Sequence, residues 1–168
     1  MTIKLKYGNT NTFLVPGRSG YLLVDTDYIG TLPTFYKALK AAGVQMKDIA
    51  FVLATHYHPD HMGLIPELMK QCVSLLLLDT QTKDVHFSDQ IFAREKALHF
   101  VSIDESEAKA VNCHESRAFL ASIGIAGESF PRPATAGTAF PSSLMTGIAL
   151  SGIWSRWNTF PSMTTIPP

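Results

Sequence analysis

The chain has 168 residues, 46% of them hydrophobic, which is enough for one domain with a buried core. Its 14 basic and 14 acidic residues give no net charge, so composition excludes a general attraction to nucleic acid or to an anionic membrane. The N-terminus lacks the apolar core of a signal peptide, and no apolar run is long enough to span a bilayer. Cys72 and Cys113 match no disulfide or zinc-finger spacing. These features predict a cytoplasmic protein with two buried free thiols.

The first 43 residues predict three strands followed by a helix. Strands are expected at residues 3–7, 11–16 and 20–27, because turn residues separate these apolar runs. The helix would begin after Thr31 as its N-cap, carry Pro33 in its first turn and end at Gly43. Helical spacing places four apolar residues on its core face: Leu32, Phe35, Tyr36 and Leu39.

Two near-continuous apolar runs, at residues 48–55 and 73–79, predict strands that are covered on both faces. A helix over residues 63–72, with Pro66 in its first turn, would connect them. Residues 80–102 predict a loop with a short helix near 89–98. Residues 104–122 carry acidic residues at their front and predict a third helix.

Four residues of metal-ligating type, three histidines and one aspartate, follow the first buried run in "ATHYHPDHMGL". Residues two apart on an extended segment point the same way, so His56 and His58 can present their imidazoles to one ion. The chain turns after Pro59, so Asp60 and His61 project differently and suit a second ion nearby. The alternative is a polar loop whose histidines are satisfied by hydrogen bonds. Four such residues at one strand end favour the metal site.

The segment "THYHPDHMG" resembles the H-x-H-x-D-H signature of the metallo-β-lactamase superfamily, whose members include lactamases, glyoxalase II enzymes, lactonases and RNA-processing nucleases. The opening strands, "YLLVDTD" with Asp25 and the following helix appear in the order of that family, so the resemblance covers Met1 to about Glu128. It implies a mixed α/β (α+β) chain in the αββα sandwich fold.

The resemblance also implies a site with two zinc ions. His56 and His58 would bind the first ion, and Asp60 and His61 the second. Asp25 would lie behind these ligands as a supporting or structural residue. The alternative, that it is only an Asp that ends a strand in a turn, is favoured equally. A zinc-held hydroxide would attack an ester, thioester, amide or phosphodiester of a small-molecule substrate. Asp60 would be both a ligand and an orienting or proton-accepting catalytic group.

The family pattern demands later ligands that this chain does not show. One expects a histidine in a segment like "PGHS", an aspartate in a "GD" pair and a last histidine near the end. His86, His99 and His114 lie in segments that match none of these, and they read as ordinary histidines. We therefore predict an open, weak metal site in an incomplete half-sandwich. Its exposed apolar face would lower stability and favour self-association.

Composition changes abruptly after Glu128. Of the 14 basic and 14 acidic residues, only Arg132 and Arg156 lie beyond it, with six of the ten prolines and both tryptophans. This divides the chain into a metallo-β-lactamase-like portion, residues 1–128, and a low-charge tail, residues 129–168. Disordered tails are usually charged and poor in Trp and Phe, so the tail fits neither a linker nor the family's second half. Its apolar segment "SLMTGIALSGIW" predicts a strand or two.

A reading-frame shift explains the tail. When each codon's third base is read together with the first two bases of the next codon, with free choice of synonymous codons, "PRPATAGTAFPSSLMTG" can become "TPGHSGDSISLVLDDG", and a "GD" pair overlaps Gly152 and Ile153. Because Met and Trp codons end in G, the shifted codons reaching Thr146 and Asn158 are forced to Asp and Glu. The leading hypothesis is thus a truncated zinc hydrolase, weak or inactive as given. The alternative is a non-catalytic metal-binding or protein-interaction module.

Overall fold

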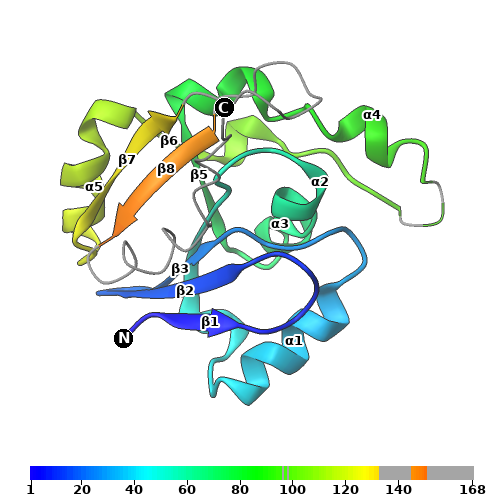
Figure 1. Cartoon of the computed structure of the whole chain (residues 1–168), viewed down its shortest axis with the longest axis horizontal. Helices are drawn as coiled ribbons and strands as arrows, with labels where there is room; N and C mark the ends of the chain where they lie inside the picture. The colour runs from blue at the N-terminus through cyan, green and yellow to red at the C-terminus, as the bar shows by residue number, and fades with distance from the viewer. Residues whose placement is uncertain (96, 98, 133–144, 151–168) are drawn as a thin grey trace, which may run out of the picture.

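The computed structural model describes residues 1–95, 97, 99–132 and 145–150, and its centre is a six-stranded mixed sheet (Figure 1). The strands lie in chain order: β1 (Ile3–Leu5), β2 (Thr12–Gly17), β3 (Gly20–Val24), β4 (Ile49–Leu53), β5 (Ser74–Leu78) and β6 (Lys109–Val111). Neighbours β1 to β3 are antiparallel, and β3 to β6 are parallel. The predicted α/β class and the first five strands are confirmed.

Alternating side chains of the sheet enter two separate cores. On β5, Leu75 and Leu77 pack in the first cluster, whereas Leu76 and Leu78 pack in the second. Strands β2, β3 and β4 divide in the same way. This is the period of two that a strand imposes, and both faces of the sheet are buried.

The helices cover the two faces unequally. Residues of α1 (Leu32–Ala41), α2 (Pro59–Met62), α3 (Ile65–Met69) and α4 (Asp89–Phe92) belong to the first core. Leu120 of α5 (Ser116–Ser122) belongs to the second. Figure 1 shows the same division, with α5 on the opposite side of the sheet from α1 and α3. The predicted short helix near residues 89–98 corresponds to α4.

Helix α1 begins and ends as predicted. Gly43 adopts φ +71°, its N–H donates to the carbonyl of Lys40, and the N–H of Val44 donates to that of Leu39, which is a Schellman stop. Thr31 occupies the predicted N-cap position, with Pro33 in the first turn, but its hydroxyl makes no capping hydrogen bond and donates instead to the carbonyl of Tyr28. The predicted core residue Tyr36 is 40% exposed.

The helix predicted over residues 63–72, with Pro66 in its first turn, is confirmed as the shorter α3, and α2 is a further short helix before it. Cys72 follows α3 with φ +66° and its N–H donates to the carbonyl of Met69. In this left-handed helix stop its side chain is exposed, so the prediction of a buried Cys72 is wrong. Cys113 is buried, and both thiols are free, as predicted.

The predicted helix over residues 104–122 is wrong for its first half. A 3₁₀ turn at Glu105–Glu107 precedes strand β6, and a second at Cys113–Glu115 precedes α5. The side chains of Asp104 and Asn112 accept the N–H groups of Ser106 and His114, which caps these turns. Pairing of β6 with the edge of β5 overrides the local helix preference.

A separate two-stranded antiparallel sheet follows α5. It joins β7 (Gly127–Arg132) to β8 (Met145–Leu150), and β8 lies inside the segment predicted to form a strand. Ser116 of α5 holds β7 through both backbone groups of Ser129. Strand β7 crosses the predicted boundary between residues 1–128 and 129–168. The division of the chain at that boundary stays a prediction. The proposed "PGHS" and "GD" segments, over residues 133–144 and 151–168, lie outside the described residues.

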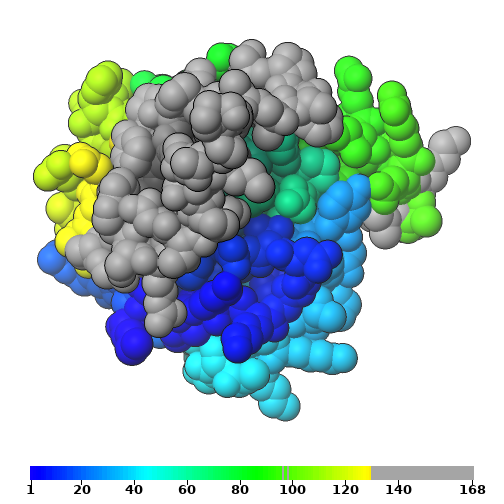
Figure 2. Space-filling model, in the orientation of Figure 1, coloured from blue at the N-terminus to red at the C-terminus, as the bar shows by residue number. Residues whose placement is uncertain are grey.

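Large apolar side chains are rarely exposed where the structure describes burial. Within residues 1–129, apart from 96 and 98, they are Met1, Tyr36 and Val101. Self-association through an apolar face thus stays a prediction. Figure 2 shows the N-terminal strands in blue beside α1 in cyan, while the segment around α4, in green, projects at one side. No helix among the described residues is long and apolar enough to cross a membrane.

Candidate functional site

The predicted site residues meet where two parallel strands end. In the register of β3 and β4, Val24 pairs with Leu53, so the residues that follow the two strands lie at one edge of the sheet. The N–H of Asp25 donates to the carbonyl of Leu53 at 2.9 Å. Thr55 and His56 follow β4. The carboxyl ends of adjacent parallel strands are the usual place of functional sites in such sheets.

Asp25 is the centre of a buried hydrogen-bond network. It is fully buried and adopts φ +57°, a left-handed conformation that is costly for a non-glycine residue. Its Oδ1 accepts the N–H of Thr55 at 2.7 Å, and the Thr55 hydroxyl lies 2.9 Å from Oδ2. On the other side, Nδ1 of His61 lies 3.0 Å from Oδ2. These contacts offset the backbone strain and place Asp25 directly behind the histidines.

Three imidazoles gather in front of Asp25. The ring centroid of His56 lies 3.9 Å from that of His61 and 4.5 Å from that of His58. His58 is the residue before helix α2, whose first turn holds Asp60. The Asp60 side chain is 53% exposed, and its Oδ2 lies 3.4 Å from Nε2 of His61. The structure thus brings the four predicted ligands together, and their roles as ligands stay predictions.

The environment shifts the three histidines in different directions. Burial, followed by the neighbouring charges of His61 and His58, lowers the pKa of His56 to about 3. Burial also lowers the pKa of His58, which Asp60 partly opposes. For His61 burial acts in the same sense, but the hydrogen bond and charge of Asp25, with the charges of Asp60 and Asp27, outweigh it and raise the pKa. Burial therefore disfavours the charged form of both His56 and His58, whereas the carboxylates favour the charged form of His61.

Residues distant in the chain hold the histidine loop. The carbonyls of Ala54 and Thr55 accept the side-chain amide of Gln81 at 2.8 and 3.3 Å. Gly63, the last residue of the motif, lies so close to the β3–α1 loop that a Cβ there would come within 2.4 Å of the backbone N of Ile29. Close approach of two backbones explains the glycine.

The four side chains are of the right chemical type to bind a metal ion, but they are not arranged to hold one. Three imidazoles and a carboxylate are suitable ligands for zinc. However, within the ranges that the structure describes, no group of three or more His, Cys, Asp or Glu side chains is arranged to hold a metal ion. One reason is visible in the contacts, since His61 directs Nδ1 to Asp25 and has Nε2 near Asp60. The arrangement does not fit a closed metal centre.

The remaining described histidines lie away from this cluster. His86 is held between Asp89, 3.0 Å from Nδ1, and Glu105, 2.8 Å from Nε2. His99 and His114 are exposed. Sequence reasoning missed Thr55, whose hydroxyl contacts both Asp25 and His56. Its position directly before the first histidine was the available signal.

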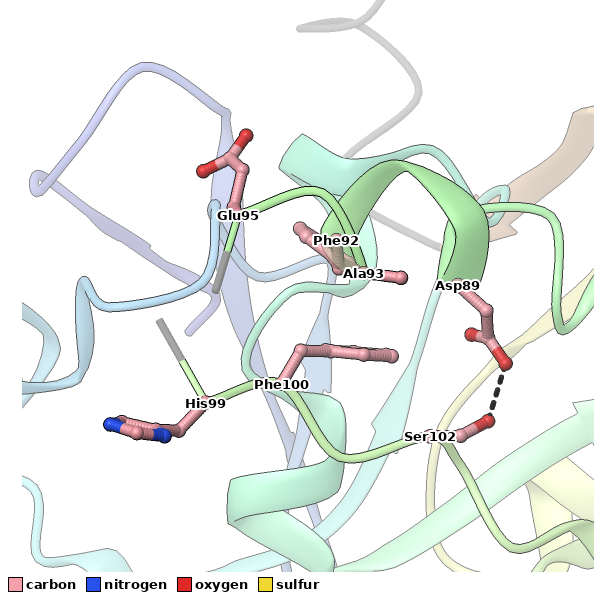
Figure 3. Close-up of a pocket in the computed structure, with 7 residues that line it drawn as sticks. All are labelled: Asp89, Phe92, Ala93, Glu95, His99, Phe100 and Ser102. Carbon is pink, nitrogen blue, oxygen red and sulfur yellow. Dashed lines mark hydrogen bonds between the residues drawn. The ribbon is translucent and has the colours of Figure 1, made fainter. Parts of the chain in front are cut away.

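A cavity of about 420 Å³ lies beside α4 and contains none of the predicted site residues (Figure 3). It is lined by Asp89, Phe92, Ala93, Glu95, His99, Phe100 and Ser102. Ser102 and Asp89 are hydrogen-bonded to each other at one end of it. The histidine cluster and this cavity are therefore separate features.

Comparisons with known proteins identify the fold. Residues 5–74 match the model of the metallo-β-lactamase superfamily. No curated protein sequence matches the chain. Among solved structures, the native FEZ-1 metallo-β-lactamase from Legionella gormanii is similar with a TM-score of 0.56 and 14% identity, over 89% of this chain and 62% of that one.

Two further solved structures are similar. A motif mutant of the metallo-β-lactamase from Cronobacter sakazakii has a TM-score of 0.55 and 16% identity, over 86% of this chain and 55% of that one. A β-lactamase from Chitinophaga pinensis has a TM-score of 0.54 and 20% identity, over 88% of this chain and 58% of that one. The chain therefore spans less than two thirds of the length of each of these proteins.

Proposed function

Since the N-terminal part of this chain has the metallo-β-lactamase fold, we propose that it carries part of a zinc-dependent hydrolase site. The observation that supports this most is the gathering of His56, His58 and His61 at the carboxyl end of β4. In the proposed complete site, His56 and His58 are ligands of one ion, and Asp60 and His61 of the other. The substrate is a small molecule with an ester, thioester, amide or phosphodiester bond.

The chain as given has weak hydrolytic activity or none. No closed metal centre is present among the described side chains, and Nδ1 of His61 faces Asp25 at 3.0 Å. A site without three convergent donors binds zinc weakly. We also propose that the missing ligands are encoded in another reading frame from about Glu128. Composition supports this, because only Arg132 and Arg156 are charged beyond that point.

The remaining parts of the proposal rest on composition. The zero net charge argues against a nucleic-acid or membrane partner. The free thiols of Cys72 and Cys113 agree with a cytoplasmic location.

Metal content and turnover test the enzyme proposal. The full chain is equilibrated with zinc, its metal content is measured by mass spectrometry, and hydrolysis of a panel of esters and phosphodiesters is followed. We expect zinc well below two ions per chain and turnover that is low and abolished in His58→Ala. His114→Ala, which removes an exposed histidine outside the cluster, is the matched control. Turnover that survives in His58→Ala refutes the zinc mechanism.

The nucleotide sequence of the gene tests the frame-shift proposal. We expect the alternate frame to encode a PGHS-like segment over the codons of residues 131–146. If that frame contains a stop codon there or lacks the histidine, the frame-shift proposal is wrong, and the tail is the native sequence.

A second candidate function is a non-catalytic metal-binding or protein-interaction module. The absence of a ready group of three metal ligands among the described residues favours the protein-interaction form of this alternative over the metal-binding form. Stoichiometric zinc without any turnover, lost in His58→Ala but retained in His114→Ala, would support this module over the enzyme.

A further inference from the structure

The hydroxyl of Thr55 lies between the Asp25 carboxylate and one ring nitrogen of His56. It is 2.9 Å from Oδ2 and 3.0 Å from Oδ1 of Asp25, and 3.1 Å from Nδ1 of His56. Thr55 and His56 are only 6% and 5% exposed, and Asp25 is fully buried, so water has little access to these atoms. Each contact must therefore be satisfied within the group.

Counting protons leaves one arrangement. A carboxylate only accepts hydrogen bonds, so the Thr55 hydroxyl donates its single proton to Asp25. The same hydroxyl can then only accept from His56, which requires a proton on Nδ1. The His56 ring is buried against the imidazoles of His58 and His61, surroundings that favour the neutral ring, which carries one proton.

We propose that Asp25, acting through the Thr55 hydroxyl, holds His56 in the Nδ1–H tautomer and leaves Nε2 as the ring's only lone pair. Thr55 is thus a positioning residue: it acts through His56 and touches no reacting group. The hydrogen bond at one ring nitrogen generally decides the state of the other. Without such a partner, a neutral histidine side chain prefers the opposite tautomer.

This role also explains why Asp25 serves two histidines. It contacts Nδ1 of His61 directly, at 3.0 Å, and Nδ1 of His56 through Thr55. One carboxylate therefore fixes the orientation of two rings from behind. The use of the free Nε2 as a ligand rests on the proposed function, whereas the tautomer itself does not.

Nitrogen NMR of the metal-free full chain at neutral pH tests the proposal. The ¹⁵N shifts of a histidine distinguish the protonated from the unprotonated ring nitrogen, and the His56 signals are assigned by their loss in His56→Gln. We expect wild type and Thr55→Ser to show His56 protonated at Nδ1. We expect Thr55→Val to move that proton to Nε2. His86, which contacts Asp89, Ser102 and Glu105 instead, should keep its signals in all variants.

The outcomes separate this inference from the proposed function. Protonation of His56 at Nε2 in wild type overturns the inference, even if Thr55→Val does not fold. An unchanged tautomer in folded Thr55→Val overturns it as well. Failure of the chain to take up zinc, with the tautomer as expected, refutes only the proposed function, because the NMR measurement contains no metal.

Discussion

Asp25→Asn and Asp60→Asn make the same chemical change in two carboxylates of one cluster, and we expect opposite results. Asp25 is fully buried, accepts the Thr55 N–H at 2.7 Å and the Thr55 hydroxyl at 2.9 Å, and lies 3.0 Å from Nδ1 of His61. An asparagine offers one acceptor oxygen and adds an NH₂ group that has no acceptor there. At least one buried donor and the new amide lose their partners.

Each buried polar group without a partner costs about 1–3 kcal/mol, so two such groups in Asp25→Asn should lower the free energy of unfolding by about 2–6 kcal/mol. The Asp60 side chain is 53% exposed, and its contacts to His61 and Thr10 are 3.4 and 3.5 Å long. Water replaces such contacts, so Asp60→Asn should cost less than about 1 kcal/mol.

Urea unfolding followed by circular dichroism measures both variants, and equal slopes against urea show that the denatured states are comparable. If a variant is too unstable to show a folded baseline, that result agrees with the expectation for Asp25→Asn and contradicts the expectation for Asp60→Asn. The reasoning is refuted if Asp25→Asn unfolds within 1 kcal/mol of wild type. It is also refuted if Asp60→Asn is the more destabilised variant.

Three further predictions concern packing and pH. In urea unfolding, Gly63→Ala should lower the free energy of unfolding by about 3 kcal/mol or more, because the new Cβ would lie 2.4 Å from the backbone nitrogen of Ile29. Gly43→Ala should lower it by about 1–2 kcal/mol, because the site has open space but the backbone has φ +71°. Equal losses in the two variants would contradict this. Phe35→Ala should lower the free energy of unfolding by about 3–5 kcal/mol, because Phe35 is fully buried. Tyr36→Ala should lower it clearly less, because Tyr36 is 40% exposed. A larger loss in Tyr36→Ala would show that the core face of α1 is wrongly assigned. Lowering the pH from 6.5 to 5 should destabilise the metal-free chain, because the pKa of His56 is about 3 when folded and 6.5 when unfolded, so only the unfolded state gains the proton. For His56 the slope should rise from about 0.7 kcal/mol per pH unit at pH 6.5 to about 1.3 at pH 5, because the unfolded side chain is half protonated at pH 6.5. His58, whose pKa is also lowered, adds a further contribution of the same sign. His61, whose pKa is raised, binds its proton more readily in the folded state and so partly opposes this trend near pH 6.5. A slope unchanged in His56→Asn would refute the assignment.

Local sequence patterns correctly predicted the helices and strands whose local preference is the same as the structure that tertiary packing requires. Gly43 stops α1 because the position needs φ +71°, and the buried runs around Phe51 and Leu76 form strands β4 and β5. The helix expected over residues 104–122 failed in its first half because Lys109–Val111 pairs with β5, which is more than 30 residues earlier in the chain. A partner strand at that distance leaves no trace in helix spacing.

In the candidate site, too, some features could be predicted from residue spacing and others depend on the folded chain. The ligand-type residues were readable because they lie within six positions of one another, from His56 to His61. The role of Thr55 was not, because its partner Asp25 is 30 residues away and only the β3–β4 register brings them together. The direction of His61 toward Asp25 depends likewise on the folded neighbours rather than on spacing.

The bond from the Asp25 N–H to the carbonyl of Leu53 has a consequence for motion. The back of the site is an extension of the β3–β4 pairing, so it opens only when the two central strands separate. The amides of Asp25 and Thr55 should therefore exchange with solvent deuterium nearly as slowly as those of Leu23 and Val52, at the rate of global unfolding. The amides around Asp60, on the short exposed turn of α2, should exchange far faster. The protein would thus keep its histidines on a rigid base while the turn that carries Asp60 fluctuates on its own.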